Sequence, residues 1–511
     1  MIIIYHQDNK VVEIDGGREA IDFLNKSIAD TLFEIAKKNS ESYVVWCILD
    51  LKPNLNLSAI VDVVHHRKIM ASYNLSKKIF LPESIGYVEG TPFININKQV
   101  TYPTWQMSTD VGCIHASVLL SLKNLIKVDQ NFDYFLCSLA KLAMPNGLLC
   151  YSEPKLLKEP SVEIKKQKND DFVLFRFVKQ HYRIQWVFLL FLNLLLYERK
   201  IALLPLLYSF FFSRRKLNPD IFDNIKVQST KNIKSGTIDV IIPTIGRKKY
   251  LYDVLKDLSK QTYLPQKVII VEQNPAVNSV SELDYIDNES WPFVIEHIFT
   301  HQPGACNARN LALSKVTSEW VFLNDDDNRF EANLIEDTLQ NCSKYGSIVA
   351  NSSYLKEHEI KNASNVYQVP FFGSGNSFIA STLLEKVSFR MGFEFGYGED
   401  SDFGMQLRNL GADVLFFPNP EIIHLSAPIG GFRTKPVLAW SKDVVQPKPS
   451  PTIMLYKQLH STKEQINGYK TILFFKFYKV QTIKNPFLYF NNFKKQWTKS
   501  LYWANELKNI K

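Results

Sequence analysis

The stretch that most constrains this chain spans residues 320–327 and reads WVFLNDDD. Its apolar part has the composition of a buried strand, and it ends in three consecutive carboxylates. Open α/β sheets bind ligands at the carboxyl ends of their strands, and crowded carboxylates repel one another unless a cation lies among them. Mn²⁺ and Mg²⁺ suit oxygen ligands and also bind substrate phosphates. The stretch therefore indicates either a metal site or an acidic turn before the helix expected near Glu331, whose N-terminus favours negative charge.

The length of the chain predicts two or three domains. Its 511 residues exceed what one hydrophobic core usually serves, and 46% hydrophobic with 22% charged residues is typical of a globular protein. Six scattered cysteines form no CxxC pair, which argues against a structural zinc site or a disulfide framework and fits a reducing cytosol. The first residues lack the basic region and long apolar run of a signal peptide. These features predict a cytoplasmic protein.

Residues 237–435 alternate between strand and helix patterns, as in an α/β domain. We expect strands at 238–242, 267–271 and 294–299, a helix at 250–261 and a central strand that ends at the acidic triplet. This alternation predicts a parallel-rich sheet covered by helices on both faces. Thr244, Gln273 and the triplet all follow strands, so we expect them in the ligand crevice at one edge of the sheet.

Several short motifs in this segment occur in the order and spacing of a known family. They read Pro243-Thr-x-x-Arg247, Gly304-x-x-x-Ala-Arg-Asn310, Asn324-Asp-Asp-Asp327, Gly398-Glu-Asp-x-Asp-Phe403 and His424. On these motifs, residues 237–435 resemble a family 2 glycosyltransferase with the GT-A nucleotide-sugar fold. The resemblance implies an α/β protein with a GT-A, Rossmann-like mixed sheet in its C-terminal half and a nucleotide-sugar donor as its partner.

The resemblance also implies which residues do the chemistry. Asp325, Asp327 and His424 would hold Mn²⁺ or Mg²⁺ against the donor diphosphate. The donor-binding residues would be Pro243, Thr244, Arg247, Glu272, Gln273, Arg309, Asp325, Asp326 and Gly375. The general base would be Asp400, with Glu399 as the alternative, and we expect Asp402 to cap the same helix. A single displacement by this arrangement inverts the anomeric centre.

The pair Glu272-Gln273 departs from the family pattern. Many relatives carry two acidic residues after the second strand, one of which contacts the base. A glutamine amide both donates and accepts hydrogen bonds, so Gln273 can still bind a pyrimidine. The nucleotide therefore stays open between UDP, dTDP and GDP.

The pattern of residues 1–160 predicts a second, smaller α/β domain that resembles a degenerate GT-A unit. The segments 41–50, 110–117 and 131–138 parallel 319–325, 373–381 and 399–406 in order and rough spacing, and a helix is expected at 20–38. Asp50-Leu-Lys52 lacks the acidic triplet, and its lysine would compete with a metal. We therefore interpret this domain as degenerate, binding an acceptor or a partner rather than catalysing.

Residues 161–236 form an apolar helical segment followed by a polar linker. Residues 186–197 and 201–212 are strongly apolar, but each run is shorter than the ~20 residues that span a bilayer. A membrane-spanning helix would also have to bury Glu198, Arg199 and Lys200, which is costly. We expect either an interfacial helical pair or helices buried between domains.

Residues 436–511 are expected to form a basic, aromatic helical tail. Eleven lysines and two glutamates follow residue 450, which accounts for the net charge of +9 of the whole chain. Lysines interleaved with aromatic residues suit a helix on an anionic membrane surface, at the inner face of the cell membrane, and they equally suit packing on the catalytic domain. No recognised nucleic-acid-binding module accompanies the charge, so no nucleic acid partner is expected.

Together these patterns predict an inverting, metal-dependent glycosyltransferase. It would move a sugar from a nucleoside-diphosphate sugar to a hydroxyl of a cell-surface glycan or a lipid-linked acceptor. The alternative is a non-catalytic carbohydrate-binding or scaffold protein that keeps the fold without turnover. Asp325, Asp327, Asp400 and His424 argue against that alternative, because a scaffold has no need of all four.

Overall fold

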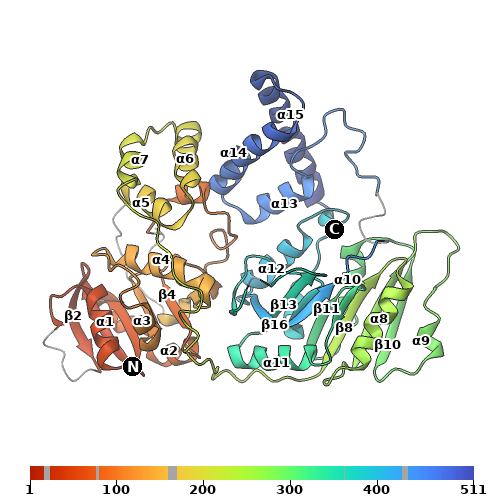
Figure 1. The fold of residues 1–511 in the computed structure, drawn as a ribbon, viewed down its shortest axis with the longest axis horizontal. Helices are drawn as coiled ribbons and strands as arrows, with labels where there is room; N and C mark the ends of the chain where they lie inside the picture. Colours follow the sequence, from red (N-terminus) through yellow and green to blue (C-terminus); the bar gives the residue numbers. More distant parts are fainter. Residues whose placement is uncertain (17–22, 76–79, 159–169, 362, 429–435, 511) are drawn as a thin grey trace. The chain divides into compact units, whose positions relative to one another are not determined.

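The computed structural model describes residues 1–16, 23–75, 80–158, 170–361, 363–428 and 436–510 (Figure 1). The chain divides into two compact units. The first unit comprises residues 1–232 with 365–368 and 462–473, and the second comprises 233–364, 369–461 and 474–511. The predicted domain boundaries at 160 and 435 lie outside the described residues, and the boundary at 236 stays a prediction.

The first unit is built on a mixed sheet. In spatial order its strands are β2 (Lys10–Asp15), β1 (Ile2–Gln7), β3 (Tyr43–Ile48), β6 (Val111–His115), β4 (Ile69–Tyr73), β7 (Leu149–Ser152) and β5 (Tyr102–Pro103). Its helices include α1 (Ile28–Lys38), α2 (Leu57–Val63), α3 (Ala116–Leu122) and α4 (Phe132–Ala143). Trp46 is completely buried over Gly112, where a Cβ would lie 2.2 Å from the indole ring. A glycine on β6 is therefore required for the tryptophan of β3 to fill the core.

The first helix begins later than its apolar spacing predicts. Helix α1 starts at Ile28, whereas we expected a start at residue 20, and residues 17–22 lie outside the described part of the chain. Asn25 has a left-handed backbone with a φ of 62°, and its N–H donates to the carbonyl of Val11. This turn ties the segment to β2, so the helix cannot extend toward the N-terminus.

A helical layer in the first unit contains the apolar segment. It consists of α5 (Asp171–His181), α6 (Ile184–Asn193), a π-helical turn (Leu194–Glu198) and α7 (Leu203–Ser209) (Figure 1). Phe175, Phe177 and Leu190 are buried in the core of this unit, whereas one side of α6 and α7 is exposed. Within the described residues, no helix is both long enough and apolar enough to cross a membrane.

The second unit contains a larger mixed sheet with helices around it (Figure 1). In spatial order its strands are β10 (Val294–Thr300), β9 (Lys267–Gln273), β8 (Ile238–Thr244), β11 (Trp320–Asn324), β15 (Asn376–Ala380), β13 (Val349–Lys356), β16 (Leu415–His424) and β12 (Asn328–Phe330). Its helices include α8 (Lys248–Ser259), α9 (Tyr285–Asn288), α10 (Ala305–Leu313), α11 (Leu334–Tyr345) and α12 (Glu399–Asn409). The predicted α/β class with a mixed sheet in the C-terminal half is confirmed.

Parallel pairing brings the predicted site residues to one edge of this sheet. Strands β10, β9, β8 and β11 run in the same direction, and β15 runs antiparallel to β11. Thr244, Gln273 and Asn324 are the last residues of β8, β9 and β11. The strand ends therefore meet where open α/β sheets bind ligands.

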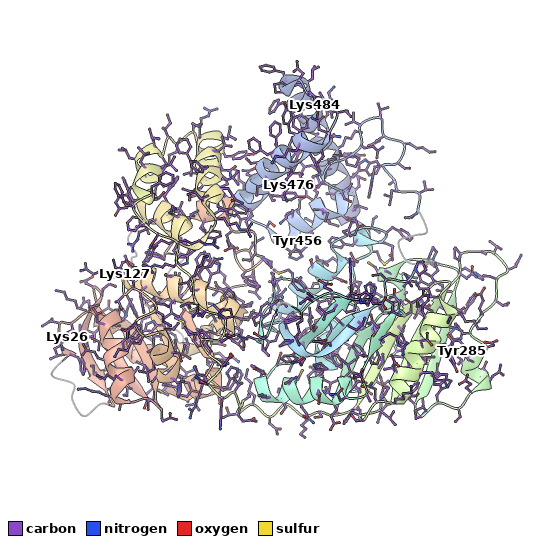
Figure 2. The ribbon with its side chains drawn as sticks, in the orientation of Figure 1. Lys26, Lys127, Tyr285, Tyr456, Lys476 and Lys484 are labelled. Atoms are coloured by element: carbon purple, nitrogen blue, oxygen red, sulfur yellow. The ribbon has the colours of Figure 1, made fainter. Side chains whose placement is uncertain are left out.

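The expected helical tail is present and packs closely. It consists of α13 (Pro451–His460), α14 (Lys463–Val480) and α15 (Pro486–Lys508). Tyr489, Phe493 and Trp497 on α15 are buried, so much of its aromatic content faces protein. Lys476 on α14 and Lys484 before α15, both labelled in Figure 2, are exposed. The tail is thus part of the folded chain, with lysines on its open side.

The two units repeat one pattern of strand pairing. In the first unit β1 pairs parallel with β3, β3 antiparallel with β6, β6 antiparallel with β4, and β4 parallel with β7. In the second unit β8, β11, β15, β13 and β16 pair in the same directions and order. Helix α4 lies between β6 and β7 in the chain, as α12 lies between β15 and β16. This repetition supports our interpretation of the first unit as a GT-A-like relative of the second.

Candidate active site

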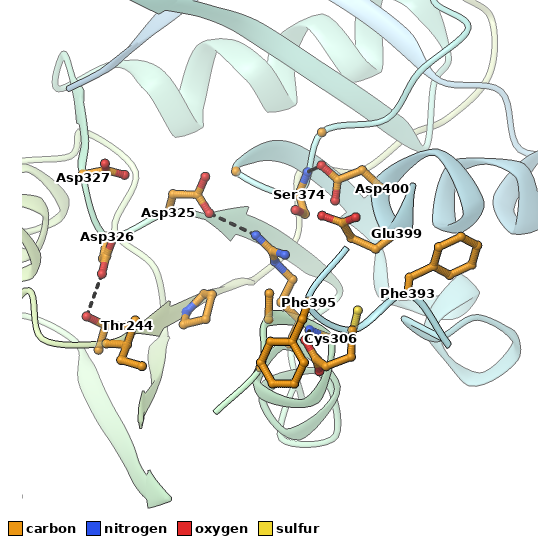
Figure 3. Close-up of a pocket in the computed structure, with 18 of the residues that line it drawn as sticks. Thr244, Cys306, Asp325, Asp326, Asp327, Ser374, Phe393, Phe395, Glu399 and Asp400 are labelled. Carbon is orange, nitrogen blue, oxygen red and sulfur yellow. Dashed lines mark hydrogen bonds and ion pairs between the residues drawn. The ribbon is translucent and has the colours of Figure 1, made fainter. Parts of the chain in front are cut away.

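The middle carboxylate of the acidic triplet, Asp326, is held by protein groups (Figure 3). Its Oδ2 accepts a hydrogen bond from the Thr244 hydroxyl at 2.7 Å, and its Oδ1 accepts one from the Arg247 guanidinium at 2.6 Å. Burial raises the pKa of Asp326 to about 6, although the charge of Arg247 opposes this shift. Because both oxygens are engaged, Asp326 fixes the loop after β8 to the end of β11 rather than offering free oxygens to an ion.

The first carboxylate, Asp325, bonds to two other groups. Its Oδ1 accepts a hydrogen bond from Arg309 at 3.2 Å, and its Oδ2 accepts one from the Tyr354 hydroxyl at 2.9 Å. The Tyr354 ring stacks on His424 with 5.0 Å between ring centroids. A Cβ at Gly375 would lie 2.2 Å from Oδ2 of Asp325. Any side chain at position 375 would therefore push this carboxylate out of place.

Asp327 and His424 form the part of the site that best fits a cation. Oδ2 of Asp327 accepts a hydrogen bond from the Ala427 N–H at 2.7 Å. Its buried Oδ1 lies 3.3 Å from Nε2 of His424 and makes no hydrogen bond within the described residues. Although burial opposes the shift, contact with His424 lowers the pKa of Asp327, and the Asp327 carboxylate in turn raises the pKa of His424. A buried carboxylate oxygen without a hydrogen bond fits a ligand for Mn²⁺ or Mg²⁺.

The side chains do not complete a metal site by themselves. Across the described parts of the chain, no group of three or more His, Cys, Asp or Glu residues is arranged to hold an ion. Asp325 is already engaged by the Arg309 guanidinium. Mg²⁺ commonly combines one or two carboxylates with waters and substrate phosphates. The residues present therefore fit a cation that binds jointly with a diphosphate.

A second pair of carboxyl groups, Glu399 and Asp400, begins helix α12. The preceding Gly398 has a φ of 112°, which favours glycine and turns the chain into the helix. Oδ2 of Asp400 accepts a hydrogen bond from the Ser374 N–H at 3.2 Å, whereas its buried Oδ1 makes no hydrogen bond within the described residues. Burial and the charge of Asp400 raise the pKa of Glu399 to about 7, and burial also raises the pKa of Asp400. These properties suit a general base.

Arg309 supplies fixed positive charge between the two acidic groups. Its guanidinium bonds to Asp325, and its charge opposes the burial that raises the pKa of Asp400. Its Nε is buried and makes no hydrogen bond among the described residues. The side chain is 8% exposed, so it needs little reordering to meet an anion. We therefore expect Arg309 to contact an anionic ligand.

A cavity of about 710 Å³ joins these groups. The predicted site residues that line it are Pro243, Thr244, Arg247, Gln273, Arg309, Asp325, Asp326, Asp327, Gly375, Glu399, Asp400 and His424. Its volume is within the range of ligand-sized pockets. The predicted donor-binding residue Glu272 does not line it. Glu272 instead bonds to His297 at 2.9 Å and to the Glu282 N–H at 3.1 Å, and so braces β9 against β10.

Gln273 offers the cavity a hydrogen-bond donor. Its Oε1 accepts a hydrogen bond from the Gly304 N–H at 2.6 Å. Because a backbone N–H can only donate, this contact fixes the amide oxygen toward Gly304 and leaves the NH₂ group for another partner. Gln273 therefore suits a carbonyl oxygen of a ligand.

Two residues of the cavity, Tyr354 and Glu394, were missed by the sequence analysis. Tyr354 reaches Asp325 because β13 pairs in parallel with β16 and places Tyr354 opposite Ile422. Glu394 lies in a loop and accepts hydrogen bonds from the backbone N–H groups of Cys306 (3.2 Å) and Asn307 (2.9 Å). It thereby caps helix α10 where that helix meets the cavity. Neither residue lies in a motif, so only tertiary structure reveals them.

The expectation that Asp402 caps helix α12 is wrong. Gly398 occupies the cap position, and Asp402 lies within the first turn. The buried Asp402 carboxylate instead bonds to Arg390 (2.6 Å), Gln406 (2.8 Å) and His460 (2.7 Å). Because His460 is the last residue of α13, the tail helps to hold the helix that carries the second acidic pair.

Part of the chain is similar to known glycosyltransferases. Residues 239–402 match the family model described as Glycosyl transferase family 2. The chain is 23% identical over 236 residues to Glycosyltransferase GlyG of Streptococcus pneumoniae serotype 4. The matched region covers 42% of this chain and 78% of that relative. It is similar to the solved structure of S. aureus TarS in complex with UDP (17% identity, TM-score 0.31, covering 38% of this chain and 61% of that one). It is also similar to GalNAc-T7 with UDP, GalNAc and Mn²⁺ (15% identity, TM-score 0.33, covering 41% and 47%).

Proposed function

Because residues 239–402 form a glycosyltransferase family 2 domain, we propose that this enzyme moves a sugar from a nucleoside-diphosphate sugar to a hydroxyl group with inversion. One observation carries the proposal. The acidic triplet and the Glu399–Asp400 pair line the same cavity, and Arg309 lies between them. Such a cavity can hold an anionic leaving group beside a general base.

The residues at the triplet are proposed to bind the donor diphosphate. Asp327 and His424, with Asp325, would hold Mn²⁺ or Mg²⁺, which when bound supplies Lewis-acid stabilisation of the leaving diphosphate. Arg309 adds a buried positive charge that is already oriented, so little reorganisation accompanies the reaction. The NH₂ group of Gln273 would donate to a carbonyl oxygen of the base.

Asp400 is proposed to act as the general base. It would take the proton of the acceptor hydroxyl as that oxygen attacks the anomeric carbon, while the bond to the diphosphate breaks on the opposite face. Burial raises the pKa of Asp400, which makes it a stronger base than an exposed aspartate. Glu399 lines the cavity beside it and is the alternative base.

A thermal-shift screen of the full chain tests the proposal. Nucleotide sugars are added singly with Mn²⁺ or Mg²⁺, and a ligand at 100 times its Kd should stabilise the protein by about 2.7 kcal/mol. We expect one nucleotide sugar to raise the Tm, and more so with the ion than without it. If no nucleotide sugar raises it with either ion, the proposed donor site is wrong. Binding without release of nucleoside diphosphate to any acceptor would favour a non-catalytic carbohydrate-binding protein.

The acceptor is proposed to be a hydroxyl of a cell-surface glycan or of a lipid-linked precursor. Transfer would then take place in the cytoplasm, with the enzyme bound peripherally at the inner face of the membrane. The exposed lysines of the tail support this location. Deleting the tail is a poor test of it, because residues 462–473 belong to the first unit and His460 bonds to Asp402. Substitutions on exposed surfaces are the cleaner experiment.

The first unit is proposed to be non-catalytic. Strand β3 pairs with β6 in the way that β11 pairs with β15, and the first residue pairs are Tyr43 with His115 and Trp320 with Ala380. When these two pairs are matched, Ile48, Leu49 and Asp50 fall at the positions of the acidic triplet. Two of the three carboxylates are thus replaced by apolar side chains. The Thr109 N–H donates to Asp133 at 3.4 Å, at the position where the Ser374 N–H donates to Asp400 in the second unit. The unit keeps the counterpart of the base and, in Asp50, that of Asp327, but it lacks the counterparts of Asp325 and Asp326.

Substitutions in the first unit should therefore spare the chemistry. We expect Asp50→Ala and Asp133→Ala to leave turnover on a small soluble acceptor within about twofold of wild type. The measurement is release of nucleoside diphosphate, with the Tm of each variant as the control for folding. A loss in either variant as large as that of Asp400→Asn, at an unchanged Tm, would make the first unit a participant in catalysis.

A further inference from the structure

The outer face of α6 and α7 exposes a continuous set of large apolar side chains. Within the described residues 184–211, eleven of them are at least 40% exposed: Ile184, Phe188, Leu195, Leu196, Ile201, Leu203, Leu204, Leu207, Tyr208, Phe210 and Phe211. Leu204 is 70% exposed and Phe211 is 85% exposed. We call this set the α6–α7 face. Large apolar patches on a protein surface usually mark a binding site.

The α6–α7 face is one surface rather than scattered residues. On α7 and just beyond it, the exposed positions 203, 204, 207, 208 and 211 repeat with helical spacing, while Pro205, Leu206 and Ser209 are buried on the other side. The ring of Phe188 on α6 lies 5.9 Å from that of Phe210, centroid to centroid. The exposed sides of the two helices therefore meet.

Charge is confined to the ends of the two helices. Residues 184–197 and 201–212 contain no charged side chain, whereas residues 183–216 as a whole contain six cationic residues and one acidic residue. The exposed cations are Arg183, Arg199, Lys200, Arg214 and Lys216. An apolar face with a basic rim complements a layer that is apolar inside and negatively charged at its surface.

We propose that the α6–α7 face docks the first unit onto an anionic lipid surface. The apolar side chains would enter the boundary between headgroups and acyl chains, and the basic rim would contact lipid phosphates. Apart from Glu198 at the turn between the helices, residues 184–211 offer only the amides of Gln185 and Asn193 to pair a protein partner, and Asn193 is buried. Both helices are too short to span a bilayer, so the contact lies in the plane of the membrane.

Vesicle flotation of the full chain tests this proposal. Vesicles of phosphatidylcholine with phosphatidylglycerol are compared with vesicles of phosphatidylcholine alone. The test variant is Leu204→Glu with Phe211→Glu. The matched control is Leu57→Glu with Val61→Glu on α2, whose side chains are 46% and 58% exposed and which lies at the other end of this unit from α6 and α7 (Figure 1). Both variants add two glutamates to exposed apolar positions, so only their place differs.

We expect wild type and control to float with anionic vesicles, and the test variant to lose at least about tenfold in vesicle affinity at an unchanged Tm. Raised salt should weaken the wild-type binding. Equal flotation of test variant and wild type would overturn the proposal. A third variant, Phe487→Glu with Leu488→Glu, changes exposed apolar residues of the tail. If only this tail variant fails to float, the membrane contact lies on α15 and the proposal is also overturned. A wild-type dimer that ignores vesicles and becomes monomeric in the test variant would also overturn it, because the face would be an interface between two copies.

Discussion

Replacing Asp400 by asparagine is expected to abolish sugar transfer while the donor still binds. The amide cannot take a proton from the acceptor hydroxyl, and loss of a general base commonly costs about 100-fold or more in rate. The Ser374 N–H can still donate to the oxygen of an asparagine, so the loop that carries it should stay in place. The measurement is kcat at saturating donor, together with the thermal shift that the donor produces. Near-normal kcat would mean that Asp400 is not the base.

The thermal stability of Asp400→Asn shows whether a loss of activity comes from the missing base or from a damaged fold. Burial raises the pKa of Asp400, so the folded state binds a proton more tightly there than the unfolded state does. The cost of keeping the carboxylate charged is therefore present above its folded pKa and relieved below the unfolded one. A neutral asparagine removes that cost, and the Tm of Asp400→Asn at alkaline pH should equal or exceed that of wild type. Glu399→Gln is the companion variant, and a larger loss there than in Asp400→Asn would identify Glu399 as the base.

The same pair of acids sets the pH dependence of the wild type. Burial and the charge of Asp400 raise the pKa of Glu399 to about 7, and burial raises the pKa of Asp400. A base must be deprotonated to act, so kcat/KM should fall by up to about tenfold per unit as the pH drops below the pKa of the pair. A flat profile from neutral to acidic pH would contradict this assignment.

Replacing Asp327 by alanine is expected to remove the dependence of donor binding on metal. Its Oδ1 is the buried oxygen that makes no hydrogen bond among the described residues, and the substitution also leaves His424 without its carboxylate partner. We expect kcat/KM to fall by at least about 100-fold, because the cation stabilises the leaving diphosphate by several kcal/mol. In thermal-shift measurements, the ion should add nothing to the stabilisation by a nucleotide sugar. A chelator added to wild type should reproduce both effects.

Asp326→Asn is the matched control for the metal assignment. Asp326 bonds to Thr244 and Arg247, so its loss should loosen the loop after β8 and weaken donor binding. The remaining binding and activity should stay sensitive to a chelator, unlike those of Asp327→Ala. Full activity of the wild type in excess chelator would remove the metal from the mechanism altogether.

The sequence predicts the parts of this site that depend on local order along the chain. The strand ends at Thr244, Gln273 and Asn324 could be placed because apolar runs and the residues that terminate them are adjacent in sequence. The acidic triplet is likewise identified as the end of an apolar run, whereas the role of the Glu399–Asp400 pair is implied by the resemblance to family 2 glycosyltransferases. Parallel pairing then brings such strand ends to one edge, so their convergence could be inferred from the α/β alternation.

Other features depend on contacts that no local pattern encodes. Tyr354 reaches Asp325 through the register of β13 on β16, and Glu394 caps α10 from 88 residues away from Cys306. Asp402 looked like a helix cap because it is an acid near a helix start, but its partner His460 comes from the tail. In each case the deciding partner is distant in sequence, and propensity alone cannot identify it.

The late position of helix α14 in the sequence affects the order in which the two units can fold during synthesis. Residues 462–473 belong to the first unit, where Gln465 donates hydrogen bonds to the carbonyls of Glu89 at 2.9 Å and Thr91 at 2.8 Å. Gly468 approaches the Tyr87 backbone so closely that a Cβ would lie 2.4 Å from its carbonyl oxygen. At ~5–20 residues per second, a ribosome delivers these residues on the order of 10–50 s after residue 232. The strands of the second unit all precede residue 425, so that sheet can form while the first unit still waits for its last helix. The unit that is synthesised first is therefore completed only when residue 473 of the 511 has been made.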